Sequence, residues 1–267
     1  GARILLAEDN RLNQIVAEGF LHQLGLEVTV VGDGAQAVSA MQASPPGTFA
    51  AILMDLHMPV LDGLESTRRI RALSAGAHTP IIGMTAAVLP EDRAQCLEAG
   101  MVDHVSKPVV PERLIQILLR WTQPERASTP PRVNPAPAAP PAASSHDVID
   151  HPLELDLDAL RERLHGNEDL LWILLKTFLD SESDTSHVLE GMLSQGEVQR
   201  AKFKVHDLKG SSANLGAMRI SDASAALETA LMKGQGIDSA MAHLRQTLTT
   251  GLGTIRFLMS NRSSRGA

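Results

Sequence analysis

The sequence predicts two domains of different fold class: an α/β domain built on a doubly wound, five-stranded parallel sheet, followed by an all-α domain that forms a four-helix bundle. Three observations support this prediction. Five short apolar segments alternate with amphipathic stretches in residues 1–121. Residues 122–150 are rich in proline, alanine and serine. From residue 151 onward, apolar residues recur with the helical period of about 3.6.

The predicted strands are short and apolar, as is typical of a sheet that is covered on both faces. They are residues 4–7, 28–31, 50–54, 81–84 and 103–105. Helical patterns lie between them, for example at 12–24 and 91–98. Strands that alternate with helices indicate a parallel sheet, and in such sheets the ligand site lies beyond the carboxyl ends of the strands.

The segment at 122–150 contains seven prolines and almost no large apolar residue, so it cannot bury a core. We interpret it as an extended, semi-rigid linker. It separates a first domain at 1–121 from a second domain at 151–262, which a disordered tail at 263–267 follows. In the second domain a short helix is expected near 157–164, and four longer helices are expected at 168–194, 197–214, 218–233 and 237–259.

Composition argues against several classes of function. The net charge is −7, which disfavours nucleic acid as a partner because its phosphates require clustered lysine and arginine. No apolar run approaches the roughly 20 residues of a membrane helix, so no membrane contact is expected. The single cysteine, Cys96, cannot form an internal disulfide, which suits a reducing cytoplasm. No signal peptide is visible, and the abrupt start at Gly1 suggests a segment of a longer protein.

Charged and hydroxyl side chains directly follow four of the predicted strands. Glu8 and Asp9 follow the first strand, Asp55 the third, Thr85 the fourth and Lys107 the fifth. Because the ends of parallel strands converge at one edge of the sheet, we expect these side chains to lie together. Three carboxylates repel one another unless a cation lies among them, and hard oxygen ligands favour Mg²⁺. The pocket predicts phosphoryl transfer to a carboxylate, with Lys107 and Thr85 contacting the phosphoryl oxygens.

A second candidate site lies on a predicted helix around His206. A core-facing stripe is expected at Ala201, Val205, Leu208, Ser212 and Leu215. His206, Lys209 and Gly210 share a neighbouring face that should be exposed. A neutral imidazole is a nucleophile near neutral pH, and Lys209 can reach a phosphoryl group carried by it. Glycine costs about 1 kcal/mol relative to alanine inside a helix, so Gly210 indicates the close approach of a partner's phosphorylated loop.

Four segments of the first domain resemble the motifs of response regulator receiver domains. They are 4–10 (ILLAEDN), 54–59 (MDLHMP) with Asp62-Gly63 after it, 84–86 (MTA) and 106–108 (SKP). The resemblance implies a flavodoxin-like fold in which Asp55 accepts a phosphoryl group and Thr85 and Lys107 contact its oxygens. It also makes the Lys107–Pro108 bond a candidate cis peptide. The Mg²⁺ ligands that it implies are Glu8, Asp9, Asp55 and the backbone carbonyl of His57.

The first domain departs from the common receiver pattern at His104. Many receivers carry tyrosine or phenylalanine three residues before the lysine, and the ring of that residue moves with the threonine. This chain has His104 there and contains no tyrosine. We therefore expect a solvent-facing polar side chain at this position, without a conventional aromatic switch. We expect a receiver of this kind mainly to pass the phosphoryl group on, with less need of a large conformational change.

The string His206-Asp207-Leu208-Lys209-Gly210-Ser211-Ser212-Ala213-Asn214-Leu215-Gly216 resembles the active helix of histidine phosphotransfer (HPt) domains. In that family the histidine lies on the second helix of a four-helix bundle and carries a phosphoryl group. The resemblance implies that His206 is the phosphorylated histidine, that Lys209 assists it, and that ATP is neither bound nor hydrolysed.

Together the two resemblances match the C-terminal end of a hybrid sensor histidine kinase, which is a two-component signalling protein of bacteria. The predicted function is a phosphorelay: Asp55 accepts a phosphoryl group from a kinase histidine and relays it to His206, which passes it to a separate response regulator. The expected partners are an upstream histidine kinase core, in the same full-length protein, and a downstream response regulator. No ATP-binding kinase core is visible here. The segment is expected in the cytoplasm, and its parent could be anchored in the inner membrane.

Two alternatives stay open at this point. Mg²⁺-dependent phosphohydrolases of the haloacid dehalogenase type place a second aspartate two residues after the nucleophile as general acid, where this chain has His57. A non-catalytic interaction module would use the receiver fold for docking alone, although the intact set of acidic and basic residues argues against it. The sequence also leaves open whether transfer occurs within or between chains, and whether the two domains pack together.

Overall fold

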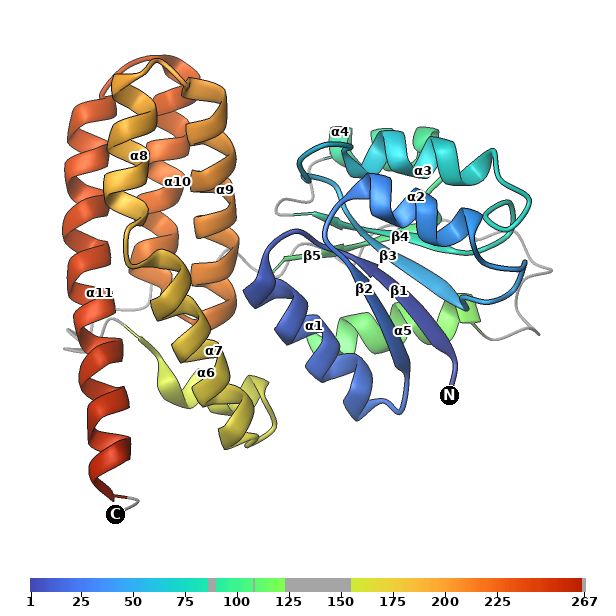
Figure 1. Cartoon of the computed structure of the whole chain (residues 1–267), viewed down its shortest axis with the longest axis horizontal. Helices are drawn as coiled ribbons and strands as arrows, with labels where there is room; N and C mark the ends of the chain where they lie inside the picture. Colours follow the sequence, from blue (N-terminus) through green and yellow to red (C-terminus); the bar gives the residue numbers. More distant parts are fainter. Residues whose placement is uncertain (86–89, 108, 123–154, 266–267) are drawn as a thin grey trace.

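The computed structural model describes residues 1–85, 90–107, 109–122 and 155–265. The first domain contains a sheet of five strands in the order β2-β1-β3-β4-β5, and every pair of neighbours is parallel (Figure 1). The strands are β1 (Arg3–Ala7), β2 (Glu27–Val31), β3 (Ala51–Asp55), β4 (Ile81–Thr85) and β5 (Asp103–Ser106). The predicted five-stranded parallel sheet is confirmed, and each strand lies within one or two residues of its expected range.

Five helices cover the two faces of this sheet (Figure 1). One face carries α1 (Arg11–Gln23) and α5 (Pro111–Thr122), and the other carries α2 (Gly34–Gln42), α3 (Gly63–Arg71) and α4 (Pro90–Ala99). Every residue of β3 and β4 is buried, as expected for central strands covered on both sides. The chain reverses direction across the sheet between β1 and β3, which places a crevice at their carboxyl ends.

The second domain is entirely helical in its described residues. Its helices are α6 (Leu157–Arg163), α7 (Glu168–Glu182), α8 (Thr185–Ser194), α9 (Val198–Leu215), α10 (Met218–Lys233) and α11 (Ile237–Arg265). The predicted bundle is confirmed. Helices α8 to α11 run side by side in Figure 1, and α7 continues the bundle below α8. The helix α11 extends to Arg265, into the tail expected at 263–267.

A further difference from the prediction is that the expected helix at 168–194 is divided between α7 and α8. The division falls in a polar run in which side chains compete for backbone and carboxylate partners. The hydroxyl of Ser183 donates to the carbonyl of Leu179, and Thr185 donates to the buried carboxylate of Glu182. Glu182 also pairs with Lys204 of α9 at 2.9 Å. This local network, which the apolar period does not reveal, turns the chain between the two helices.

Most of the linker expected at 122–150 lies outside the described residues, as does Pro108 of the candidate cis peptide. No helix within the described ranges is long and apolar enough to cross a membrane.

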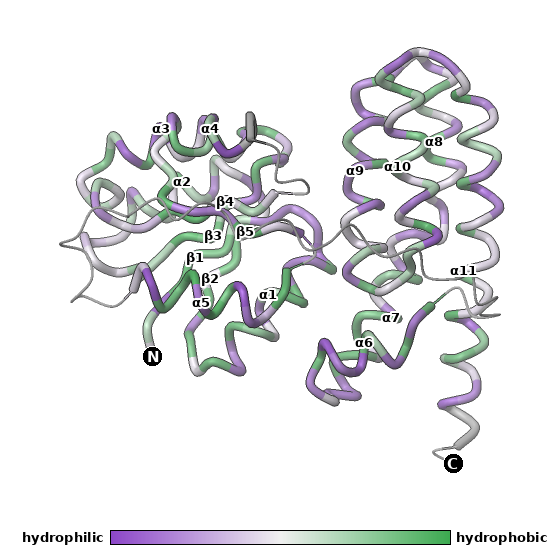
Figure 2. Tube along the Cα trace, turned by 180° about the vertical axis from the view of Figure 1, so that it is seen from behind, coloured by the Kyte–Doolittle hydropathy of each residue, from purple (hydrophilic) through white to green (hydrophobic). Residues whose placement is uncertain are grey.

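The two domains lie side by side, with α1 of the first packed against α7 and α9 of the second (Figure 1). Figure 2 shows the same arrangement from behind, with α9 facing the first domain. One cluster of buried apolar side chains continues through both domains and includes Phe20 of α1, Leu170 of α7 and Leu208 of α9. The sequence left open whether the two domains pack together, and this contact shows that they do.

Candidate functional site

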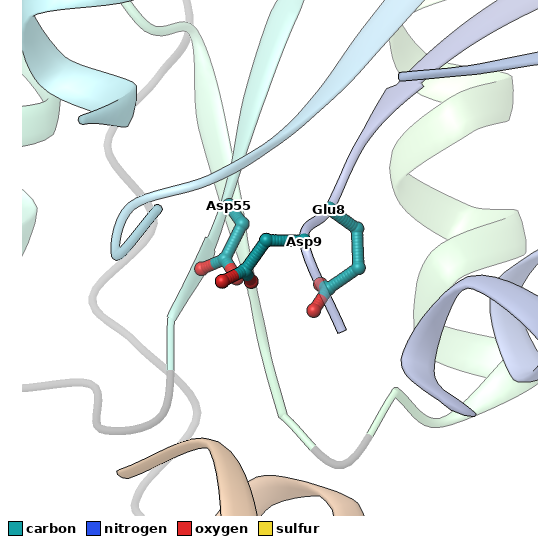
Figure 3. A group of neighbouring side chains, drawn as sticks. All are labelled: Glu8, Asp9 and Asp55. Atoms are coloured by element: carbon teal, nitrogen blue, oxygen red, sulfur yellow. The ribbon is translucent and has the colours of Figure 1, made fainter. Parts of the chain in front are cut away.

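The acidic pocket lies at the carboxyl edge of the sheet. Glu8 and Asp9 directly follow β1, and Asp55 ends β3. Carboxylate oxygens of these three residues lie within 4.8 Å of one another, and Figure 3 shows the side chains pointing into one space. Lys107 follows β5 and reaches the same pocket. The structure therefore brings together the carboxylates and the lysine that the strand ends predicted.

Lys107 is the counter-charge of this pocket. Its Nζ atom lies 2.6 Å from Oε2 of Glu8 and 2.6 Å from Oδ2 of Asp55, and its side chain is 8% exposed. Burial lowers the pKa of Lys107, but the charges of Glu8 and Asp55 outweigh this effect and raise it overall. Lys107 therefore stays charged in the pocket.

Two of the carboxylates carry less negative charge than isolated ones would. Burial raises the pKa of Glu8 to about 8, with Lys107 opposing and Asp55 adding to the shift. Burial and the charge of Asp55 raise the pKa of Asp9 to about 6. One lysine thus leaves part of the repulsion among the three acids uncompensated.

This donor set fits a divalent cation. Oδ1 of Asp9 is buried and has no hydrogen-bond partner among the described residues, and a buried oxygen without a partner is costly. Hard carboxylate oxygens that converge within 4.8 Å are ligands of the kind that Mg²⁺ and Ca²⁺ take. The acidic cluster can therefore hold a metal ion.

Helix α1 supplies two residues that hold Glu8 in place. Nδ2 of Asn13 donates to Oε1 of Glu8 at 2.8 Å, and Nε2 of Gln14 donates to the backbone carbonyl of Glu8 at 2.6 Å. Asn10 caps the helix by accepting from the amides of Leu12 and Asn13. The cap fixes where α1 begins and thereby aims Asn13 at the pocket.

Two further residues predicted for the first domain are Thr85 and His104, and only His104 differs from its expected position. Thr85 ends β4 and is 3% exposed, and its carbonyl accepts from the amide of Lys107 at 2.7 Å. His104 differs from the expectation of a solvent-facing side chain, because it is half-buried and burial lowers its pKa. The reason is its place on β5, where it is paired in register with Gly83 of the buried strand β4.

His206 lies in the middle of α9, on the helix predicted for it. The core-facing stripe on the same helix is confirmed, since its members Ala201, Val205, Leu208, Ser212 and Leu215 are fully buried. The side chain of His206 is 22% exposed. It is therefore less open than the exposed face that we expected, because the first domain covers part of it.

Glu228 on α10 connects His206 and Lys209. Its Oε1 lies 2.8 Å from Nδ1 of His206, and its Oε2 accepts from Nζ of Lys209 at 2.6 Å. Burial raises the pKa of Glu228, but these two hydrogen bonds, together with the positive charge beside it, outweigh burial and lower it to about 2. An ionised carboxylate can only accept, so Nδ1 of His206 carries the hydrogen. In the neutral ring, Nε2 then keeps its lone pair as a nucleophile.

The two sites face each other across the domain contact. The rings of His57 and His206 lie 4.7 Å apart between centroids and are tilted by 49°. His57 comes two residues after Asp55, and its amide donates to Oδ1 of Asp55 at 3.1 Å. Asp207, next to His206, also faces the pocket: burial and the charge of Asp9 raise its pKa to about 7.

Sequence reasoning missed Glu228, Asn13 and the ring of His57 as members of this site. Glu228 is far from His206 along the chain and stands in no motif, so only helix packing reveals it. Asn13 lies three residues after the cap of α1, where its polar side chain interrupts an apolar face. That interruption was the available signal.

The fold and these two facing sites define a phosphorelay module, in which an aspartate-bearing receiver precedes a histidine-bearing helical bundle. Comparison with known families agrees: the model of the response regulator receiver domain matches residues 4–119, and the Hpt domain model matches residues 173–256. The chain therefore contains a response regulator receiver domain followed by an Hpt domain.

Similar proteins include sensor proteins and histidine kinases. The chain is 30% identical over 239 residues to the sensor protein GacS of Pseudomonas syringae pv. syringae, covering 86% of this chain and 24% of that protein. It is 38% identical over 120 residues to hybrid signal transduction histidine kinase I of Dictyostelium discoideum, covering 43% of this chain and 7% of that protein. The chain thus spans a quarter or less of the length of these relatives.

One solved structure with a similar sequence is the receiver domain of the sensor histidine kinase PA1611 from Pseudomonas aeruginosa PAO1. It is 48% identical, with a TM-score of 0.43, and the match covers 46% of this chain and 98% of that one. That crystal structure has a magnesium ion coordinated in its active site cleft.

Proposed function

We propose that Asp55 accepts a phosphoryl group from a kinase histidine and passes it to His206, which donates it to a separate response regulator. The observation that carries this proposal is the facing of the two sites: His206 contacts His57, two residues from Asp55. Both residues belong to matched domains, Asp55 to the receiver and His206 to the Hpt domain.

We assign Mg²⁺ to the acidic pocket. Glu8, Asp9 and Asp55 would hold it, together with the backbone carbonyl of His57, and the unpartnered Oδ1 of Asp9 supports a cation there. When bound, Mg²⁺ neutralises charge on the phosphoryl oxygens. The magnesium ion in the cleft of the PA1611 receiver is consistent with this assignment.

The transfer to His206 balances without loss of a proton. The bond between phosphorus and the Asp55 carboxylate oxygen breaks, while a bond between phosphorus and Nε2 of His206 forms. Asp55 leaves as a carboxylate, and the hydrogen on Nδ1 of His206 stays where Glu228 accepts it. Glu228 thereby offsets the positive charge that develops on the ring.

Three further residues act on the phosphoryl group in this proposal. Lys107 already lies 2.6 Å from Oδ2 of Asp55 and would contact the oxygens of a group carried there. Thr85, buried at the end of β4, would contact another oxygen. Lys209, one helical turn after His206, would contact the group once it is on the imidazole.

The phosphoryl group has a donor before Asp55 and an acceptor after His206. We assign the donor to a histidine kinase core, in the same full-length protein, by analogy with the hybrid kinases that the chain resembles. The acceptor is a response regulator encoded separately. A cytoplasmic location and a membrane-anchored parent stay predictions from the sequence and from this analogy.

The test is phosphotransfer from acetyl phosphate or from a phosphorylated kinase core, with wild type, Asp55→Asn and His206→Gln compared. We expect acid-stable, base-labile label on Asp55 and acid-labile label on His206. The His206 label should disappear in Asp55→Asn, whereas Asp55 should still be labelled in His206→Gln. Label that reaches His206 without Asp55 would contradict the proposed order.

The same assay separates the two alternatives. An aspartyl phosphohydrolase would release inorganic phosphate from small phosphate esters in many turnovers. A purely docking module would show label on neither Asp55 nor His206.

A further inference from the structure

The contact between the domains is built around two buried amides. Nδ2 of Asn214, on the Hpt helix α9, donates to Oδ1 of Asn13, on the receiver helix α1, at 2.7 Å. Asn13 is 7% exposed and Asn214 is 2% exposed. Amides hidden from water are stable only when they are paired, so this pair fixes how the two helices lie against each other.

The same pair continues into the phosphorylation pocket. Asn13 donates to Glu8 at 2.8 Å, and Glu8 pairs with Lys107, which in turn pairs with Asp55. A continuous polar path therefore runs from the helix of His206 to Asp55. Asn13 holds a predicted Mg²⁺ ligand with one end of its amide and the Hpt domain with the other.

A close helix contact lies beside this pair. A Cβ atom added at Gly19 of α1 would come within 2.9 Å of Cδ2 of Leu170 on α7, and its other near neighbours also belong to Leu170. Glycine is a poor helix former, but here it lets α1 approach the bundle. A larger side chain at position 19 would therefore meet the Hpt domain and leave the receiver undisturbed.

Noncovalent interactions alone hold this contact in the described residues. The shared apolar cluster and the Asn13–Asn214 bond favour it. Contacts between domains of one chain permit relative motion by default, so the docked state can open during a reaction cycle.

Docking also hides His206. Its side chain is 22% exposed and lies against His57. Any second receiver would need its own aspartate within about 3–3.5 Å of the reacting atom for transfer. The receiver of the same chain occupies that space.

We infer that the receiver docks on the Hpt domain of its own chain through Asn13, Gly19 and their partners, so that Asp55 transfers to His206 within one chain. The same contact closes His206 to other receivers, and the downstream response regulator binds only after the chain's own receiver has left. This inference rests on the proposed function and assigns the partner of each step.

The first test compares transfer within and between chains. Full chains are loaded at Asp55 with acetyl phosphate, and the appearance of acid-labile label on His206 is followed at several protein concentrations. In wild type the rate constant should not depend on concentration. A mixture of His206→Gln and Asp55→Asn chains can transfer only between molecules, so its rate should rise with concentration. Gly19→Gln should lower the wild-type rate about tenfold or more, which corresponds to a loss of about 1.4 kcal/mol of docking free energy.

A matched control uses the same substitution at another helical glycine. A Cβ at Gly191 of α8 would meet nothing within 4 Å, so Gly191→Gln should transfer like wild type. Asn214→Ala serves as a second variant, because it removes one partner of the amide pair without changing a residue of the receiver pocket. It should also slow the transfer within the chain.

The second test measures how accessible the His206 side chain is to a reagent in solution. Diethyl pyrocarbonate modifies accessible histidines, and the extent at His206 can be read by peptide mass spectrometry in unphosphorylated full chains. Gly19→Gln and Asn214→Ala should increase the modification rate at His206 several-fold, whereas Gly191→Gln should not. The modification rate depends on the exposed fraction of His206. If Gly19 mattered only for the structure of the receiver itself, its substitution would not change this rate.

The outcomes separate the inference from the proposed function. A wild-type rate that is proportional to protein concentration, or a His206 modification rate that is equal in wild type and Gly19→Gln, would overturn docking within the chain. In either case label could still pass from Asp55 to His206 and the proposed function would stand. Absence of label on both residues would overturn the proposed function itself and the inference with it.

Discussion

Nδ1 of His206 and Oε1 of Glu228 lie 2.8 Å apart, and the second carboxylate oxygen of Glu228 binds Lys209 at 2.6 Å. One acidic residue on α10 thus orients the nucleophile and its neighbouring cation on α9. This relationship fixes the tautomer of His206 and points the reactive Nε2 away from α10.

Substitution of Glu228 should slow transfer to His206 without preventing the labelling of Asp55. Glu228→Ala removes the acceptor for Nδ1, so we expect a loss of about tenfold or more in the single-turnover rate. Glu228→Gln keeps a carbonyl acceptor and should lose less. Glu190→Gln, which removes an exposed partner of Arg245, is the control and should have almost no effect. Equal rates in Glu228→Ala and wild type would contradict this role.

Gly63→Ala should destabilise the receiver. A Cβ at Gly63 would lie 2.1 Å from the backbone oxygen of Asp55, and backbone cannot move aside as a flexible side chain can. Overpacking of this kind costs about 1–3 kcal/mol or more, so the free energy of unfolding should fall by that amount. Thermal unfolding measures it. Gly191→Ala, in open space on α8, should instead stabilise the chain by up to about 1 kcal/mol.

Gly210 should tolerate alanine but not a long side chain. A Cβ there would have Nδ2 of Asn13 as its near neighbour, at 3.9 Å, which is an ordinary contact. Gly210→Ala should therefore raise stability by about 1 kcal/mol and leave transfer intact. Gly210→Gln should slow transfer by pushing α1 away. Loss of transfer in Gly210→Ala would show that the approach is tighter than the structure indicates.

In the chain without bound Mg²⁺, docking should weaken as pH rises through about 7, because burial and the charge of Asp9 raise the pKa of Asp207 to about 7 in the docked chain. When the domains separate, Asp207 loses the burial and the charge of Asp9 that raise its pKa, so the docked state binds more protons. Higher pH then favours separation. The groups that face Asp207 are Asp9 and Asp55 of the receiver and Lys204 and His206 of its own helix.

Small-angle X-ray scattering between about pH 6 and pH 8 should detect this change as a radius of gyration that increases with pH. Asn at position 207 cannot ionise, so the radius of gyration of Asp207→Asn should change less than that of wild type over the same range. A wild-type radius that does not change would contradict the prediction.

Removal of divalent cations should abolish the labelling of Asp55 by acetyl phosphate. Excess chelator should stop it, and added Mg²⁺ should restore it. Asp9→Asn replaces the carboxylate whose Oδ1 is buried without a partner among the described residues. It should weaken Mg²⁺ binding by at least the roughly 10–100-fold that the loss of an outer-shell partner costs, as measured by isothermal titration calorimetry. Asp33→Asn, at the cap of α2, is a control that should bind Mg²⁺ normally. Full labelling in chelator would contradict the assignment.

The receiver pocket was predictable because its residues follow strands. A parallel sheet converts the order of Glu8, Asp55 and Lys107 along the chain into proximity at one edge, whatever the helices between them do. The stripe on α9 was predictable for a similar reason, since helical periodicity alone places Leu208 and Val205 on the core-facing side.

The division between α7 and α8 was not predictable from apolar periodicity. It depends on the carboxylate of Glu182, which accepts from Thr185 and pairs with Lys204. Lys204 lies on another helix, so the local sequence contains only part of the reason for the turn. The half-buried position of His104 had the same cause, because its exposure depends on the strand beside it.

The sequence by itself determined the two domains, the sheet with its acidic edge, and the helix that carries His206, because each depends on local periodicity or on strand order. Tertiary structure alone decided that Glu228 orients His206, that Asn13 joins Glu8 to Asn214, and that the two sites face each other. These relationships join residues that are distant along the chain through the packing of separate helices, and no local pattern encodes that packing.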